Sequence, residues 1–214
     1  ANVSFKINQG EKVGIIGRTG SGKSSLQKLI LNYYEPTGGA ILVSNTDINQ
    51  IDPTDLRRNI SYVPQEISLF DGTVRENIVL GTPLATDEAV LEASRIAGIV
   101  DFMNSHPQGF DLNVGERGGR LSGGQRQGVA ITRAIINRAT IVVLDEPTAS
   151  IDNTAENQFK EYFAEYIEDR TLLLVTHKAS MLSLVDRLLV LNEGKLVADG
   201  PRDEVLRALA GNST

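Results

Sequence analysis

Few folds remain open to a chain that carries a glycine-rich run between a strand and a helix, as this one does at Gly17–Ser24. Before the run, Lys12–Ile16 is strand-like, and after it Leu26, Leu29 and Ile30 recur at helical spacing. Glycines let the backbone curl so that successive N–H groups point at phosphate oxygens, and the following helix adds the positive end of its dipole. The order strand, loop, helix therefore predicts a phosphate-binding α/β fold.

Two side chains at the end of this run carry the expected chemistry. We expect Lys23 to reach the β- and γ-phosphates of a nucleotide and Ser24 to offer a hydroxyl to Mg²⁺. The competing interpretation is a plain glycine-rich turn, but a turn does not need a Lys-Ser pair at this offset. The candidate nucleotide-binding residues here are Gly17, Arg18, Thr19, Gly20, Ser21, Gly22, Lys23, Ser24 and Ser25.

A second candidate group lies at the ends of later strands. The apolar run Ile141–Leu144 leads into Asp145 and Glu146, at the strand end where open α/β sheets bind ligands. Asp145 would hold Mg²⁺ and Glu146 would activate the attacking water, whereas the alternative is a solvated strand end. His177 follows another strand-like run and would contact the γ-phosphate or the water, although a lone histidine is more often a surface residue. His106, beside a proline in a turn, receives no role.

Strand-like and helical segments alternate along the chain. A helical stretch is expected from about residue 73 to residue 102, and a helix precedes each of the strands near 140 and 171. The first two strands are expected to form a hairpin, as are the last two. The strand-like segments are Asn2–Ile7, Lys12–Ile16, Ala40–Val43, Thr140–Leu144, Thr171–Val175, Arg187–Leu191 and Lys195–Ala198.

This alternation predicts one α/β domain over residues 1–214, with no internal repeat and no long linker. We expect a P-loop NTPase (RecA-like) core with a mostly parallel sheet, an N-terminal antiparallel β subdomain and an inserted α-helical subdomain. The core would span about residues 1–65 and 129–214, and the helical subdomain about residues 66–128.

Bulk properties narrow the function classes. A net charge of −6 and a pI near 5.0 argue against a chain whose main task is to neutralise nucleic-acid phosphates. The absence of cysteine excludes disulfides and thiolate metal sites. The apolar runs are far shorter than the ~20 residues that cross a bilayer. Because the first residues already alternate like a strand, we expect a domain taken from a longer protein.

The run Leu121-Ser122-Gly123-Gly124-Gln125 precedes a helical segment that ends near Ile136. It offers a hydroxyl, close backbone approach and a helix N-terminus to an anion, while a capped helix start is the competing interpretation. With its continuation Arg126-Gln127, it resembles the signature of ATP-binding-cassette (ABC) ATPases. Over essentially the whole chain the family's other motifs follow in order, including Gln65 in Tyr62–Gln65, Asp152 in Ala149–Asp152, and His177.

The resemblance implies ATP as substrate and Mg²⁺ as cofactor. It implies that Ser122, Gly123, Gly124 and Gln125 approach the γ-phosphate held by a second copy of the domain, in a head-to-tail dimer. It also implies that Gln65 is a sensor touching Mg²⁺ or water, which places it among the catalytic and metal-binding candidates. Asp152 resembles the loop that crosses the dimer interface, and a helix N-cap is a compatible alternative.

Further segments indicate a branch of the family. Val114–Gly118 is similar to a loop by which exporters contact their membrane-spanning half, and Asp52–Ile60 and His106–Asp111 look like bacterial type I secretion ATPases for toxins or adhesins. This implies a transmembrane domain on the same polypeptide, with the present domain at the cytoplasmic face of the membrane. We expect a soluble fragment, no nucleic-acid partner and no direct contact between the cargo and the ATP site.

Three alternatives stay open. One is an exporter of lipid, peptide or drug. A second is a DNA-maintenance ATPase of the same superfamily, disfavoured because the interval from Ser24 to Leu121 has no sustained heptads and no basic run. A third is a regulator that binds nucleotide without hydrolysing it. The presence of Glu146 and His177 argues against this alternative.

Two positions depart from the family pattern. The adenine-stacking aromatic is expected to lie before residue 1, so the choice of base is carried over from the family. Ile151 stands where leucine is more usual, which is a conservative change.

Overall fold

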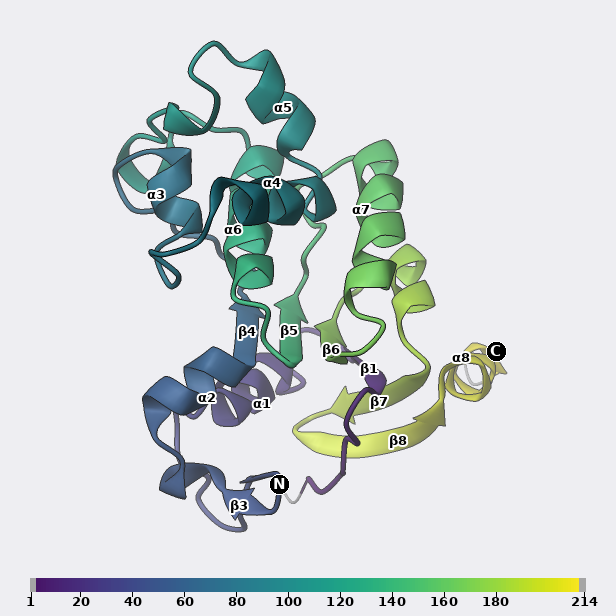
Figure 1. Cartoon of the computed structure of the whole chain (residues 1–214). Helices are drawn as coiled ribbons and strands as arrows, with labels where there is room; N and C mark the ends of the chain where they lie inside the picture. Colours follow the sequence, from purple (N-terminus) through teal and green to yellow (C-terminus); the bar gives the residue numbers. More distant parts are fainter. Residues whose placement is uncertain (1–2, 212–214) are drawn as a thin grey trace. The chain divides into compact units, whose positions relative to one another are not determined.

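The structure is a computed structural model that describes residues 3–211 (Figure 1). The chain forms two compact units. The first contains the segment up to Ile60, Thr140–Val143 and the segment from Arg170 onward, and the second contains Ser61–Ala139 and Leu144–Asp169. Each unit therefore collects segments that are distant in the sequence.

A mostly parallel sheet forms the centre of the first unit. Four strands of this six-stranded sheet lie wholly in the first unit, namely β6 (Thr171–Val175), β1 (Lys12–Ile16), β7 (Arg187–Asn192) and β8 (Lys195–Pro201). β1 pairs in parallel with both β6 and β7, whereas β8 runs antiparallel to β7. All five residues of β6 are buried, as expected of an apolar strand in a covered parallel sheet.

The expected opening hairpin does not form. Among the described residues before β1, those at positions 3–8 form no strand, and Asn2 lies outside the described residues. Both edges of β1 are occupied by parallel neighbours, which leaves no edge for an antiparallel partner. The antiparallel part of the N-terminal region is instead a small sheet of β2 (Leu42–Val43) and β3 (Thr46–Asp47).

Short helices complete the first unit. At α2, Asp52 accepts a hydrogen bond from the Thr54 backbone N–H at 2.7 Å and Pro53 occupies the first helical position, a favoured N-terminal combination. The helices are α1 (Lys23–Ile30), α2 (Pro53–Asn59), α8 (Arg202–Gly211) and the 3₁₀ helices η1 (Ile48–Gln50) and η4 (Ala179–Leu184).

The second unit is mainly helical. Its longest buried element is α6 (Gly123–Ile136), against which α4 (Asp87–Ile96) packs closely, and α4 also contacts α7 (Asn153–Tyr166) (Figure 1). A Cβ at Gly128 of α6 would lie 1.8 Å from the Ile99 side chain, so glycine permits this close approach. The other helices are α3 (Val74–Ile78), α5 (Val100–Ser105), η2 (Gly109–Asp111) and η3 (Glu116–Gly118).

Two strands lie at the chain boundaries between the units. β4 (Ile60–Val63) leads into the second unit, and β5 (Ile141–Asp145) begins in the first and ends in the second. The predicted class, with its mostly parallel sheet, small antiparallel sheet and helical segment, is confirmed. The subdomain boundaries expected near residues 66 and 128 stay a prediction.

None of the helices within residues 3–211 combines the length and the apolar character that crossing a bilayer requires.

Candidate nucleotide site

Backbone geometry shapes the glycine-rich loop between β1 and α1. Gly17, Gly20 and Gly22 have φ values of 155°, 79° and 103°. A Cβ at Gly17 would lie 2.2 Å from the backbone oxygen of Leu191, so only glycine fits at this position. The backbone N–H of Gly194, in the turn between β7 and β8, donates to the Ser21 carbonyl at 2.9 Å. The loop is thus fixed against a turn from the far end of the chain.

Polar groups inside this loop fit a phosphate. Lys23 is 8% exposed, and its Nζ donates to the carbonyls of Gly17 at 2.7 Å and Arg18 at 3.0 Å. The buried Ser21 hydroxyl has no hydrogen-bond partner among residues 3–211. A buried ammonium and an unsatisfied buried hydroxyl are groups that an entering oxyanion would satisfy.

The start of α1 is open to solvent and uncapped. Gly22 occupies the N-cap position and makes no side-chain cap, and the first turn holds no acidic residue. Arg18, Ser24 and Ser25 are exposed, as are Thr19 and Gly20. An uncapped helix start beside cationic side chains favours an anion.

Two buried carboxylates end β5. Asp145 is 6% exposed and Glu146 is 8% exposed. Glu146 has a φ of 48°, a left-handed conformation that is unfavourable for a residue with a Cβ, and Pro147 follows it. Outliers of this kind cluster at functional sites, which marks the end of β5 as a candidate for one.

The run Ser122–Gln125 caps α6 and lies against another loop of the second unit. Ser122 Oγ accepts from the Gln125 N–H at 3.2 Å, and Gln125 Oε1 accepts from the Ser122 N–H at 2.8 Å. This is a capping box, so the competing interpretation of a capped helix start holds structurally. Ser122 is nonetheless exposed, which leaves it accessible to another molecule.

The two glycines of this run are constrained from within the same chain. A Cβ at Gly123 would lie 3.1 Å from the Ser150 Cβ, and one at Gly124 would lie 3.1 Å from Ile151 Cγ2. Sequence reasoning assigned these glycines to close approach by a ligand. The structure adds a second reason, because the loop after β5 packs against them.

The remaining predicted residues are divided between the units. Gln65, after β4, is exposed in the second unit, and His177, after β6, is exposed in the first. Asp152 caps α7 by accepting from the N–H groups of Thr154 and Ala155, both at 2.9 Å. The second unit thus brings together the signature run, Glu146 and the loop to Asp152, whereas the first holds the glycine-rich loop and His177.

The loop after Gln65 is held by Arg133, a half-buried cation from α6. Asn77 Oδ1 accepts from the Phe70 N–H and its Nδ2 donates to the Phe70 carbonyl, both at 2.9 Å. Arg133 Nε donates to the Asn77 carbonyl at 2.7 Å and Arg133 Nη2 to Asn77 Oδ1 at 3.0 Å. Burial lowers the pKa of Arg133, because desolvation disfavours the charged form.

Sequence reasoning missed two contributors. Gly194 was identified only as part of a hairpin turn, and Gln127 only as the continuation of the signature. Both act through contacts between residues far apart in the sequence, which no local spacing encodes. The single available signal for Gln127 was a polar residue among the apolar positions of α6.

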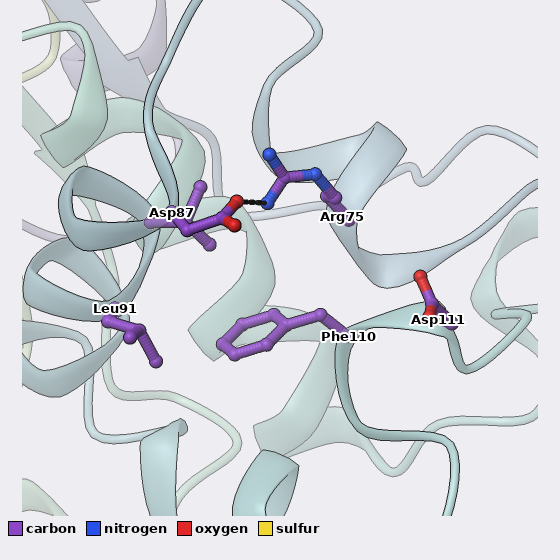
Figure 2. Close-up of a pocket in the computed structure, with 6 residues that line it drawn as sticks. Arg75, Asp87, Leu91, Phe110 and Asp111 are labelled. Atoms are coloured by element: carbon purple, nitrogen blue, oxygen red, sulfur yellow. Dashed lines mark ion pairs between the residues drawn. The ribbon is translucent and has the colours of Figure 1, made fainter.

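No group of three or more His, Asp or Glu side chains poised to hold a metal is found within residues 3–211. A separate hollow of about 510 Å³ lies in the second unit (Figure 2). There the Arg75 Nη1–Asp87 Oδ1 ion pair, at 2.7 Å, lies across from the Phe110 ring. None of its lining residues was a predicted site residue.

A glycine-rich loop between a parallel strand and a helix, with a buried lysine, is the arrangement of the P-loop nucleotide-binding proteins. The sequence profile of the ABC transporter family matches residues 1–149. The chain belongs to the ABC transporter family.

Relatives of this chain are export proteins. RT0691 of Rickettsia typhi, provisionally named an export ATP-binding/permease protein, is 40% identical over 93% of this chain and 34% of its own length. The leukotoxin export ATP-binding protein LtxB of Aggregatibacter actinomycetemcomitans is 39% identical over 96% of this chain and 29% of its own length. The chain therefore spans about a third of the curated relatives that it matches.

A solved structure shows the same fold. The structure of a bacterial Atm1-family ABC exporter with ATP bound is 36% identical, with a TM-score of 0.92. The match covers 96% of this chain and 36% of that chain. Both identity and fold thus connect this chain to ABC exporters.

Proposed function

We propose that this chain binds and hydrolyses ATP as the nucleotide-binding domain of an ABC exporter. The observation that carries the proposal is that one chain holds both the glycine-rich loop at residues 17–25 and the signature run at the start of α6. The same sequence is 39% identical to LtxB over 96% of this chain. ABC ATP-binding domains hydrolyse ATP to drive transport, and the candidate site residues of this chain support the same reaction.

Each predicted side chain has a role in this proposal. Lys23 and the N–H groups of the loop bind the phosphates of ATP, and Ser24, Asp145 and Gln65 would hold Mg²⁺. Bound Mg²⁺ neutralises charge on the phosphates. Glu146 takes the proton of the attacking water, and His177 orients the γ-phosphate or that water.

The exposed signature supports a site built from two copies. Ser122 caps its own helix and remains exposed, so its hydroxyl and the first turn of α6 are accessible to an anion from outside. We propose that this anion is the γ-phosphate of ATP on a second copy, bound head to tail. Asp152, exposed at the start of α7, would lie at the same interface.

A transmembrane partner on the same polypeptide is part of the proposal. The relatives are about three times longer, and RT0691 is described as both ATP-binding and permease. On the second unit, Phe70, Leu80 and Leu84 are exposed apolar side chains, and Glu116 and Arg117 are exposed in the loop before the signature. These exposed side chains are the candidates for contact with the transmembrane partner. The domain would act at the cytoplasmic face of the membrane.

The cargo proposed is a secreted protein, as in type I secretion, because LtxB is a leukotoxin export protein. The cargo would not touch the ATP site. Export of a lipid, peptide or drug is the alternative, since the Bacillus subtilis relative YgaD, 38% identical, carries a name for multidrug export.

Replacing Glu146 by Gln tests the central role. The variant should bind ATP as the original chain does but turn it over roughly 10²–10⁴-fold more slowly, the usual contribution of a positioned base. ATP binding by calorimetry and phosphate release measure the two effects separately. Near-normal turnover by this variant would refute the assignment.

Dependence on protein concentration tests the two-copy site. Specific activity should rise with concentration, because Ser122 completes the site of a partner. Hydrolysis by a monomer at a constant specific activity would overturn this part of the proposal.

A further inference from the structure

Gln127, on the second turn of α6, carries a buried amide that bridges two backbone groups of a different loop. The residue is 1% exposed. Its Nε2 donates to the Glu146 carbonyl at 3.0 Å, and its Oε1 accepts from the Ser150 N–H, also at 3.0 Å. Both ends of the amide are therefore used, one as donor and one as acceptor. A side chain of the same size without both functions cannot replace it.

The backbone that this amide holds is the one that orients Glu146. The Glu146 carbonyl also accepts from the Ala149 N–H at 3.1 Å, so the turn after β5 is closed by two bonds to one oxygen. The left-handed φ of 48° at Glu146 is unfavourable for a residue with a Cβ and persists only where the surroundings determine it. Because the direction of a Cα–Cβ bond follows from the backbone, holding this carbonyl also constrains the direction in which the Glu146 side chain leaves the backbone.

The same loop touches the signature run by a second route. Ser150 and Ile151 pack against Gly123 and Gly124, with a hypothetical Cβ on each glycine only 3.1 Å away. The first turn of α6 and the loop after β5 are thus joined by steric contact at residues 123–124 and by the amide of Gln127. A shift of the α6 N-terminus would be transmitted to Glu146 through both connections.

We propose that Gln127 is a positioning residue that couples the signature run to the Glu146 carboxylate of the same chain. The inference rests on the proposed function, in which the signature of one copy faces the ATP of its partner while Glu146 serves its own. Gln127 then connects the two ATP sites of a dimer inside each chain. Closure of the signature on one nucleotide sets the position of the base at the other.

Two substitutions at Gln127 and one control on the same helix test this. Gln127→Glu keeps the shape but replaces the donor to the Glu146 carbonyl by an oxygen, and Gln127→Leu removes both bonds. The control is Thr132→Val, because Thr132 is fully buried on α6 and its hydroxyl donates to the Gly128 carbonyl of the same helix, at 2.8 Å. It removes a buried polar group without touching the loop.

The expected result separates positioning from folding. Both Gln127 variants should lower kcat by roughly 10²-fold, the effect of a small misplacement of a catalytic group, with KM for ATP within about twofold. The Hill coefficient for ATP should fall toward one. Thr132→Val should stay within about twofold of the original chain in kcat and KM, as expected for a bond within one helix.

Amide exchange provides a readout that does not depend on turnover. The Ser150 N–H should exchange about tenfold faster in Gln127→Leu than in the original chain, as expected when one hydrogen bond is lost, and be unchanged in Thr132→Val. If the original chain has no ATPase activity, the proposed function fails while this measurement still tests the bridge.

Three outcomes would overturn the inference. The first is folded Gln127 variants whose kcat stays within about twofold of the original. The second is an unchanged Ser150 exchange rate. The third is a failure of both Gln127 variants to fold where Thr132→Val folds, because Gln127 would then be a structural residue.

Discussion

The two loops that carry the predicted chemistry reach their shapes by different means. The glycine-rich loop in the first unit is shaped by its own backbone, with positive φ at three glycines and with Lys23 bonded to the carbonyls of Gly17 and Arg18. The loop after β5 in the second unit holds a strained Glu146 and is fixed by Gln127, a side chain from another helix.

This difference determines how each loop responds to change. A loop set by glycine backbone tolerates no Cβ at its tightest point but depends little on remote side chains. The loop after β5 depends on a single distant side chain of α6, Gln127, and Arg133 of the same helix has the corresponding role for the loop after Gln65. We therefore expect the first loop to be most sensitive within its own sequence and the second to substitutions on α6.

The largest effect is expected from Gly17→Ala. The new Cβ would lie 2.2 Å from the Leu191 backbone oxygen, which cannot rotate away, and we expect a loss of about 3 kcal/mol of unfolding free energy. Urea unfolding measures the loss. Gly38→Ala is the matched control, since no atom lies within 4 Å of its Cβ position. If the two variants are equally stable, the backbone at Gly17 does not determine the shape of the glycine-rich loop.

A smaller effect is expected from Arg133→Met. The substitution keeps an apolar stem but leaves Asn77 without two donated hydrogen bonds, which should cost about 2 kcal/mol in this part-buried position. Arg138→Met is the control, because Arg138 pairs with Glu92 in solvent, with side-chain exposures of 66% and 63%. Thermal unfolding of both compares them. If the two variants lose the same stability, side chains of α6 do not hold the loop after Gln65.

The smallest effect concerns acid stability of the first unit. A hydrogen bond from Arg187 lowers the pKa of Asp199 below its ordinary value, with distances of 2.6 and 2.7 Å to its two oxygens. A carboxyl whose pKa is lower in the folded than in the unfolded state stabilises the fold at pH values above its unfolded pKa, near 4. This stabilisation is lost as the pH falls through the pKa of the folded state.

Asp199→Asn should therefore lose less than about 1 kcal/mol at pH 6 and nothing relative to the original chain at pH 2, because the pair is partly solvated. Urea midpoints at the two pH values measure this. The exposed Asp71→Asn is the control. If Asp199→Asn loses more unfolding free energy at pH 2 than at pH 6, the Arg187–Asp199 pair does not stabilise the fold in the way proposed.

Local patterns in the sequence predicted most elements and the chemistry of the glycine-rich loop. Strand, loop and helix at residues 12–30 are encoded by neighbouring residues, and the cap of α6 by Ser122 and Gln125 three residues apart. The opening hairpin was wrong, because alternation in residues 2–7 indicates a strand but not whether an edge of β1 is available. The contacts of Gln127, Arg133 and Gly194 could not be predicted, since each joins segments that meet only after folding.

The turn between β7 and β8 has a practical consequence. The Gly194 N–H donates to the Ser21 carbonyl, so a hairpin some 170 residues later in the chain holds the glycine-rich loop in place. We expect an added or deleted residue in that turn to move this hydrogen bond and so change nucleotide affinity without any change in the glycine-rich loop itself. Two related chains with the same glycine-rich loop would then differ in affinity because their β7–β8 turns differ.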